Sequence, residues 1–337
     1  MKVAKWLVVF SGIFAAAAGF GGCENPWMKD AVAPLRDKDK DDPSSLGLSR
    51  EELWNVEDFG LAAIDGTFNV TNTGEWNAAI TAINAGGNNK NYIINLLGSV
   101  GVPASNFGPV TGLTVSLRGG TLSCSDSGMN LLTVAGQNLV IRDCILQGDS
   151  DNGKALLKIS GGTVQLKSGG IKDNTSTDDG GGVYVYGGTF TMYGGEISHN
   201  TSTGIMNRGG GVCVTSGGTF TMYGGEISHN TSTGGGNCGG GVCVISGGTF
   251  TMNEGTITCN SAAFGGGVYV ESGFVVFNKA GGTIYGSDGG ADANSAAMFG
   301  QGYAVYAETT IPPSKYRDDT VSDSIGVSGG SHSGTWY

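Results

Sequence analysis

Apolar and polar residues alternate in short segments of this chain, and the segments return at a regular interval. The clearest segment, Thr189-Phe-Thr-Met192, is repeated at residues 219–222 and again at residues 249–252. Alternation with a period of two is typical of a strand that buries one face. The repetition extends beyond the strand, because residues 187–204 return unchanged as residues 217–234. Self-similarity this strict predicts a stack of repeated units rather than a globular enzyme core.

Three kinds of strand follow one another from residue 92 to residue 308. The first kind alternates threonine with an apolar residue, the second reads Ile-x-x-Asn, and the third reads Val-Tyr-Val or Val-Cys-Val. Three strands in each period of about 23–36 residues predict an all-β chain, a right-handed parallel β-helix of about eight coils. A β-propeller, with four strands in about 40 residues or more, fits poorly. The expected strands of the first kind are 113–117, 139–142, 163–166, 189–192, 219–222, 249–252 and 274–277.

Equivalent residues of successive coils are expected to stack in columns, because neighbouring strands lie about 4.8 Å apart. Phenylalanines would stack inside the helix and threonines outside it. At one turn the pattern predicts an asparagine ladder whose amides hydrogen-bond along the stack. Its members are Asn174, Asn200, Asn230 and Asn260.

The segment before the repeats carries the strongest helix signal of the chain. Asn72 is a suitable N-cap, and Glu75 follows it three residues later, as in a capping box. One apolar stripe then has helical spacing and consists of Trp76, Ala79, Ile80 and Ile83. We therefore predict a helix at about 73–85 within an N-terminal cap, residues 51–91, because the first coil of a solenoid needs a cover. Residues 309–337 are expected to form a C-terminal cap or tail.

The first residues of the chain have the pattern of a targeting signal. Residues 1–22 have the charged start, short apolar run and small-residue end of an export signal. Cys23 follows two glycines and resembles the lipidated cysteine of a bacterial lipobox, although Phe20 replaces the usual leucine. An ordinary signal peptide with an incidental cysteine is the alternative. Residues 23–50 mix charges of both signs with few apolar residues, which predicts a disordered tether.

Composition narrows the function further. The chain has 18 Lys+Arg against 29 Asp+Glu and a net charge of −11, which argues against nucleic-acid binding. Its 63 glycines lack a three-residue period, so a collagen helix is excluded. The 7 cysteines contain no Cys-x-x-Cys pair, and no phosphate-loop or His-Glu-x-x-His motif occurs. We expect no cofactor and a monomeric protein.

The paired signals Gly-Gly-Gly-Val-Tyr/Cys-Val and Ile-x-x-Asn resemble the repeats of right-handed β-helix surface proteins of bacteria. These proteins include the passenger regions of polymorphic outer-membrane proteins, in which alanine replaces the third glycine and phenylalanine replaces the isoleucine. The resemblance covers about residues 92–308. It implies adhesion or surface display without a defined catalytic site.

One column of the predicted stack holds residue types that ligate transition metals. It reads Asp173, His199, His229 and Cys259 in four successive coils. Neighbouring members such as His199 and His229 could share one ion. Three or four ligands would span about 10–14 Å at the coil spacing, which is too far for one tetrahedral ion. We therefore expect no resident metal, with these two histidines as the nearest approach to a site.

A second column holds Cys213 and Cys243 between Tyr184 and Tyr269. The valines on either side of each cysteine are expected to point inward, so the cysteines would point outward. The expected Cα spacing of about 4.8 Å permits a disulfide. Two free, outward-facing thiols are the alternative, and we favour it. The tyrosines of this column are expected at the surface, as tolerated residues more readily than as a carbohydrate-stacking platform.

An enzymatic interpretation is the principal alternative, because β-helices also support polysaccharide lyases and hydrolases of the pectate-lyase type. Such sites need paired carboxylates, or acids that bind calcium beside a basic residue. The candidate pairs are Glu196 with Glu226, Asp178 with Asp179, and Asp149 with Asp151. The first pair is explained by duplication, and no recurring basic residue completes the second. No catalytic residue is assigned.

The sequence thus predicts a non-catalytic, exported lipoprotein of the bacterial outer membrane, exposed at the cell surface. Lipid at Cys23 would attach it to the membrane. Its expected work is adhesin-like binding or antigenic display, with a host matrix protein or a glycan as partner.

Overall fold

The computed structural model describes residues 50–60, 62–204, 208–233, 239–297, 304–307, 315–317, 325–328 and 331–333. The chain divides into two units, Met1–Leu61 and Ala62–Tyr337. The described part of the first unit is helix α3 (Arg50–Phe59), in which the Arg50 guanidinium lies 4.4 Å from the centre of the Trp54 ring. Residues 1–22 and the predicted tether up to residue 49 lie outside the described residues.

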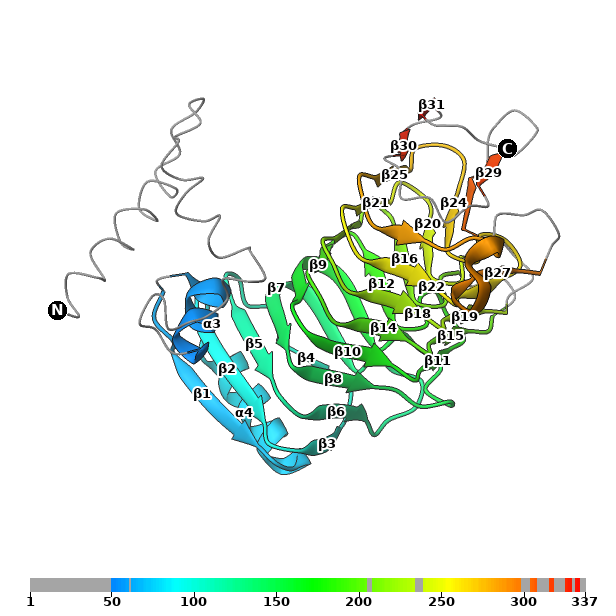
Figure 1. Ribbon diagram of the computed structural model, residues 1–337. Coiled ribbons are helices and arrows are strands. Elements are labelled where there is room, and N and C mark those ends of the chain that lie inside the picture. Colours follow the sequence, from blue (N-terminus) through cyan, green and yellow to red (C-terminus); the bar gives the residue numbers. More distant parts are fainter. Residues whose placement is uncertain are drawn as a thin grey trace, which may run out of the picture. The chain divides into compact units, whose positions relative to one another are not determined.

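The second unit is a parallel β-solenoid of about eight turns, which confirms the predicted fold (Figure 1). Three sheets run along it, and each strand pairs in register with the equivalent strand of the next coil. Threonine therefore faces threonine and phenylalanine faces phenylalanine where β13 (Thr189–Met192) pairs with β17 (Thr219–Met222). The thirty-residue copy in the sequence thus becomes one coil in the structure.

The largest sheet contains the first and third kinds of strand. The strands of the first kind are β1 (Gly66–Val70), β2 (Asn91–Leu96), β5 (Thr114–Arg118), β13 (Thr189–Met192), β17 (Thr219–Met222), β21 (Thr249–Met252) and β25 (Val276–Lys279). The strands of the third kind are β4 (Ser105–Asn106), β12 (Val183–Tyr186), β16 (Val212–Thr215), β20 (Val242–Val244), β24 (Val268–Val270) and β28 (Val305–Ala307). Two long strands, β7 (Leu132–Arg142) and β9 (Leu157–Leu166), span both positions and so join them into one sheet.

The second kind of strand forms a sheet of eight. Its members are β3 (Ser99–Val102), β6 (Thr121–Cys124), β8 (Cys144–Gln147), β10 (Gly169–Lys172), β14 (Glu196–Ser198), β18 (Glu226–Ser228), β22 (Thr256–Thr258) and β26 (Thr283–Ile284). A further sheet of two-residue strands was not predicted. It consists of β11 (Thr175–Ser176), β15 (Thr201–Ser202), β19 (Thr231–Ser232), β23 (Ser261–Ala262) and β27 (Ser295–Ala296).

Columns of identical residues fill the interior of the repeated coils. Phe190, Phe220, Phe250 and Phe277 are fully buried, and successive rings stack with centroids 5.0, 4.7 and 5.4 Å apart. The last of these rings corrects a prediction. The strand expected at 274–277 begins at Val276, two residues later, and Phe274 is 96 % exposed. Phe277 decides this register because it continues the buried column opposite Phe250.

Glycine lets neighbouring coils approach closely before the third kind of strand. A Cβ atom on Gly210 would lie 2.5 Å from the carbonyl oxygen of Gly240, and one on Gly240 would lie 2.5 Å from that of Gly266. Real side chains do not tolerate such contacts with backbone. The close approach of successive coils therefore requires the glycines of the Gly-Gly-Gly-Val motif.

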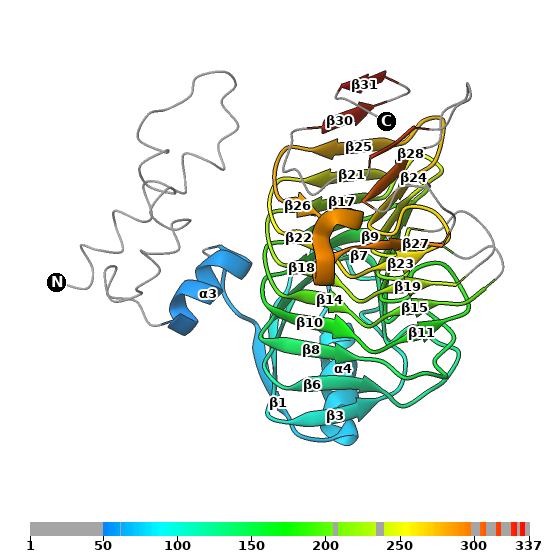
Figure 2. The same cartoon turned by 45° about the vertical axis from the view of Figure 1, so that its right-hand side comes forward.

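Helix α4 (Thr73–Ala85) covers the β1 end of the solenoid, as predicted (Figure 2). Trp76, Ala79 and Ile83 are buried in the main core, and the Trp76 indole donates to the Ser105 hydroxyl at 2.9 Å. The Asn72 side chain accepts from the Glu75 backbone at 3.0 Å, as an N-cap should. The Glu75 carboxylate, however, accepts from the Thr71 backbone at 2.7 Å rather than from Asn72, so the expected capping box is displaced by one residue.

The asparagine ladder is buried and lies one coil further along the chain than predicted, because it includes Asn294 and excludes Asn174. Asn200 donates to Asn230, Asn230 to Asn260 and Asn260 to Asn294, with amide distances of 3.0, 2.9 and 3.0 Å. Asn174 turns its amide instead to the carbonyl of Gly181, at 2.6 Å. The side-chain oxygen of Asn200 consequently has no hydrogen-bond partner.

After the 3-10 helix η3 (Ser287–Asp292), β27 and β28 are the last described strands that pair in parallel with the preceding coil. Three strands near the C-terminus pair in antiparallel fashion: β29 (Lys315–Arg317) with β28, β30 (Ile325–Ser328) with β25, and β31 (Ser331–Ser333) with β30.

Candidate functional site

The turn after the second kind of strand holds the column of candidate metal ligands. Asp173, His199, His229 and Cys259 all adopt a left-handed backbone conformation, with φ of 57, 55, 55 and 54°. Few residues other than glycine enter this region readily. The shared conformation is therefore a structural constraint on this column, independent of any ligand.

The two histidines of this column lie side by side at the surface. The rings of His199 and His229 are 4.9 Å apart and within 2° of parallel. Asp173 is engaged elsewhere, because it accepts a hydrogen bond from the Gln147 amide at 2.8 Å. The Cys259 thiol donates to the carbonyl oxygen of Ala291 at 3.2 Å. Among the described residues, no group of three or more His, Cys, Asp and Glu side chains is arranged to hold a metal ion.

An aromatic ladder that sequence reasoning missed lies at the opposite end of the same strands, just before they begin. Tyr193 and Tyr223 follow the first kind of strand, and their rings stack with centroids 5.4 Å apart. They remain 43 % and 46 % exposed. The Lys167 ammonium lies 3.5 Å from the centre of the Tyr193 ring, a cation–π contact from the preceding coil. The signal was present in the sequence, since a tyrosine in a surface turn is copied with the repeat.

The sheet between the tyrosines and the histidines presents one pair of acidic groups. Glu196 and Glu226 are Cα partners on β14 and β18, at the start of strands that lead from the tyrosines to the histidines. Ile197, the next residue, is buried in the core, so the glutamates face outward. The duplicated coils thus carry an outer face with tyrosines before the strands, carboxylates at the start of the strands and histidines just after the strands. We call the residues Tyr193, Tyr223, Glu196, Glu226, His199 and His229 the duplicated face.

The column of Cys213 and Cys243 corrects the sequence analysis. Its residues do point away from the main core, but they are covered and form a second hydrophobic cluster. Cys213, Cys243 and Tyr269 are 0 % exposed, and Tyr306 is 7 % exposed. The expectation of a surface stripe of thiols and tyrosines is therefore wrong. Alternation of residues identifies the face of a strand but does not reveal the chain segments that cover it.

Charged residues surround this second cluster. The Arg208 backbone donates to the Asp179 carboxylate at 3.0 Å, and the Arg208 guanidinium lies 3.9 Å from the Glu271 carboxylate. Burial raises the pKa of the Asp179 carboxyl, and the positive charge of Arg208 opposes that shift. The hydrogen bond with Cys243 and burial together raise the pKa of the Cys213 thiol. This arrangement could not be predicted from the sequence, because its members come from different coils.

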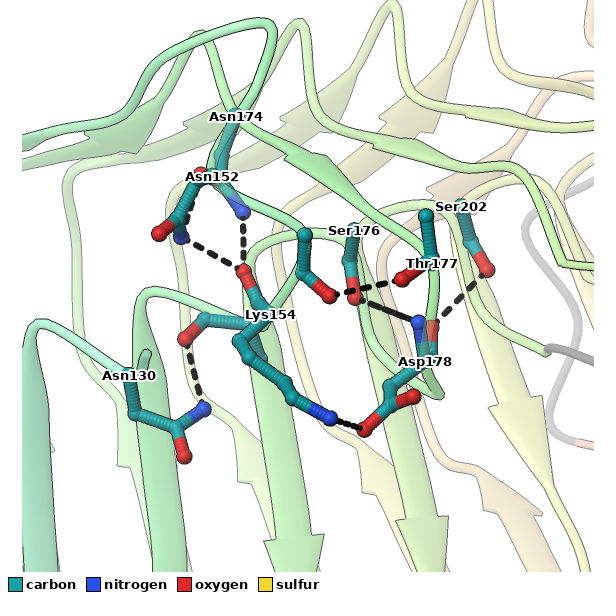
Figure 3. Close-up of polar contacts among 10 residues, drawn as sticks. Asn130, Asn152, Lys154, Asn174, Ser176, Thr177, Asp178 and Ser202 are labelled. Atoms are coloured by element: carbon teal, nitrogen blue, oxygen red, sulfur yellow. Dashed lines mark hydrogen bonds and ion pairs between the residues drawn. The ribbon is translucent and has the colours of Figure 1, made fainter. Parts of the chain in front are cut away.

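The less regular coils hold a polar corner around Lys154 and Asp178 (Figure 3). The Asn152 and Asn174 amides both donate to the Lys154 carbonyl, at 2.7 and 2.8 Å. The Ser202 hydroxyl donates to the Asp178 carbonyl at 3.2 Å, and the Lys154 ammonium pairs with the Asp178 carboxylate. Most of these contacts engage backbone carbonyls, so the corner holds turns of successive coils together.

The three candidate carboxylate pairs are placed differently. Glu196 and Glu226 lie in register, whereas Asp178 and Asp179 take separate basic partners, Lys154 and Arg208. These basic residues lie in neighbouring coils, 24 and 29 positions away in the chain. The third pair forms a local turn in which the Asp149 side chain accepts from the Asp151 backbone at 3.1 Å.

Cys23, the predicted lipidation site, lies outside the described residues. None of the described helices combines enough length with enough apolar character to span a bilayer. Comparison with known proteins gives no match: no model of a protein family, no curated protein and no solved structure corresponds to this chain.

Proposed function

We propose that this chain is a non-catalytic binding scaffold of the bacterial cell envelope, which presents the duplicated face to an extended glycan. The observation that carries the proposal is the exposed pair Tyr193 and Tyr223, stacked in register on two identical coils. An exposed tyrosine offers an apolar ring together with a polar hydroxyl, a combination common in binding surfaces.

The chemistry of the duplicated face suits a polymer of sugars. Each of the two stacked rings turns one face toward the other, so a ligand can meet the ring edges, the hydroxyls and a remaining outer face. The carboxylates of Glu196 and Glu226 can accept hydrogen bonds from sugar hydroxyls. Equivalent groups recur at the coil spacing of about 4.8 Å, so an extended chain can meet the same groups repeatedly. Several weak contacts along one polymer add up to useful affinity.

A glycan array that also carries matrix proteins tests this proposal. We expect the full chain to bind at least one glycan and the double variant Tyr193→Ala/Tyr223→Ala to lose that binding. Tyr186→Ala is the matched control, because Tyr186 is 47 % exposed and lies outside the duplicated face. Binding to matrix proteins alone, or equal binding by all three proteins, would contradict the proposal. Depolymerisation of a bound polysaccharide would contradict its non-catalytic part.

We propose further that the chain is exported and anchored by lipid at Cys23, at the outer membrane and on the cell surface. The support is the lipobox-like sequence before Cys23 and the resemblance of the repeats to those of surface-exposed β-helix proteins. Labelled fatty acid should enter the wild-type protein and not Cys23→Ser. Protease added to intact cells should remove the protein, and protection of the chain would count against surface exposure.

A further inference from the structure

The second hydrophobic cluster contains two thiols in direct contact. Cys213 on β16 and Cys243 on β20 are Cα partners in adjacent parallel strands. Their side chains hydrogen-bond to each other, and both are 0 % exposed. Both are free thiols in the structure. Tyr184 and Tyr269 occupy the column on either side, so within this column the two cysteines face one another.

The other described cysteines are arranged differently. The Cys124 thiol donates to the Asp126 carbonyl at 2.9 Å, and Cys259 donates to Ala291. Cys144 is buried in the main core, opposite Gly169 of the next coil. The contact between Cys213 and Cys243 is thus a specific product of duplication, which placed the same residue in two stacked coils.

We propose that Cys213 and Cys243 are an oxidation site, at which a disulfide joins the two duplicated coils. Neighbouring parallel strands place their Cα atoms about 4.8 Å apart, within the range of about 4.4–6.8 Å that disulfides span. The bond closes a loop of one whole repeat. Its formation in the cell rests on the proposed export, since disulfides persist in oxidising compartments.

The chemistry is thiol–disulfide exchange with a small disulfide such as oxidised glutathione. One cysteine thiolate attacks a glutathione sulfur, which forms a mixed disulfide and releases one glutathione thiolate. The second cysteine thiolate then attacks the mixed disulfide at the first cysteine's sulfur and releases the second glutathione. Two cysteine thiols have lost two protons and two electrons, and one glutathione disulfide has become two thiols.

Burial determines when this exchange takes place. Both sulfurs are covered in the folded solenoid, and the raised pKa of Cys213 lowers its thiolate fraction there. Exchange should therefore be slow in the folded protein and fast while the coils are forming. The same cover protects the finished bond against reductants.

The direct test is a refolding experiment with the full chain. The protein is refolded from denaturant with oxidised glutathione, and remaining thiols are blocked with N-ethylmaleimide. A protease that cuts after glutamate separates Cys213 from the peptide that carries both Cys238 and Cys243, and fragmentation of the linked peptides by mass spectrometry distinguishes these two cysteines. We expect a peptide containing Cys213 to be linked to Cys243. Maleimide on both residues, or linkage of Cys213 to another cysteine such as Cys238, would overturn the proposal.

Stability provides a second readout. Oxidation should raise the unfolding temperature of the wild-type protein, and Cys213→Ser should abolish the rise. Cys243→Tyr is a second variant that we expect to fold, because the next coil has Tyr269 at the equivalent position. It should also abolish the rise in unfolding temperature. Cys144→Ala is the control, since it removes a buried thiol of another column and should leave the rise intact. A rise that survives in both variants of the pair would overturn the proposal.

Disulfide formation in cells and disulfide formation on refolding test two different proposals. Refolding with glutathione requires no export, so a missing bond there refutes the oxidation site itself. A bond that forms in the refolded protein but is absent from protein blocked directly in cells would instead contradict the proposed export.

Discussion

Asp173, His199, His229 and Cys259 share a left-handed backbone conformation, with φ between 54 and 57°. Sequence reasoning recognised this column by the metal-ligand chemistry of its residues and expected no resident metal there, and the structure adds a conformational constraint. A backbone dihedral leaves no periodic signal in the sequence. The copied histidine is a residue that the turn tolerates, and its exposed ring is available for binding.

This constraint makes a prediction for His229. Replacement by valine should lower the free energy of unfolding by about 1–2 kcal/mol, because a branched L-residue is strained at positive φ. Replacement by glycine should cost little, since glycine adopts this conformation without strain. Urea unfolding measures both effects, with Thr221→Val on the adjacent extended strand as the control. Equal losses for valine and glycine would show that the conformation does not select the residue.

The asparagine ladder makes a second prediction at this scale. Asn230 is 0 % exposed, donates to Asn260 and to the carbonyl of Ile197, and accepts from Asn200. Asn230→Ala should cost at least about 3 kcal/mol, because several buried polar groups lose their partners at once. Urea unfolding should show a shift of less than about 0.5 kcal/mol for the control Asn138→Ala, which removes an exposed amide. A similar loss for both variants would contradict a stabilising ladder.

At the scale of elements, the sequence was most informative where an apolar stripe with helical spacing is bounded by an N-cap residue and a terminal glycine. Helix α4 runs from Thr73 to Ala85, as predicted, because Asn72 caps it and glycine follows it. The two-residue strands such as β15 (Thr201–Ser202) were missed, because two residues cannot establish a period. Contacts between coils, such as those of Lys154 and Arg208, were missed because they join residues more than twenty positions apart.

The lid formed by α4 can be tested through Trp76. This residue is 0 % exposed and hydrogen-bonds to Ser105 of the second coil. Trp76→Ala should lower the free energy of unfolding by about 3–5 kcal/mol and promote aggregation through the uncovered end of the core. Asn77→Ala changes an exposed residue of the same helix and should have little effect. Urea unfolding and light scattering provide the two readouts, and wild-type behaviour of Trp76→Ala would contradict the role of the lid.

At the scale of the whole second unit, repetition makes the solenoid modular. Deletion of residues 217–246 removes one coil and joins Ser216 to Gly247, which restores the sequence of the turn. The shortened chain should keep its β-rich circular dichroism and unfold cooperatively, because each coil contacts only its neighbours. Deletion of residues 217–231 removes half a coil and should disrupt the register. Loss of structure in the full-coil deletion, or its retention in both, would contradict modular stacking.

The central claim is that the tyrosine ladder binds an extended glycan. It is tested most directly by variants that change the number of stacked tyrosines, which we call rungs. Asn253 follows Met252 in the coil after Tyr223, so Asn253→Tyr adds a third ring to the ladder, while Tyr223→Asn leaves one. Affinity for the glycan selected on the array is then measured by calorimetry for one, two and three rungs. We predict that affinity increases with each rung. Affinity that does not depend on the number of tyrosines would contradict the account.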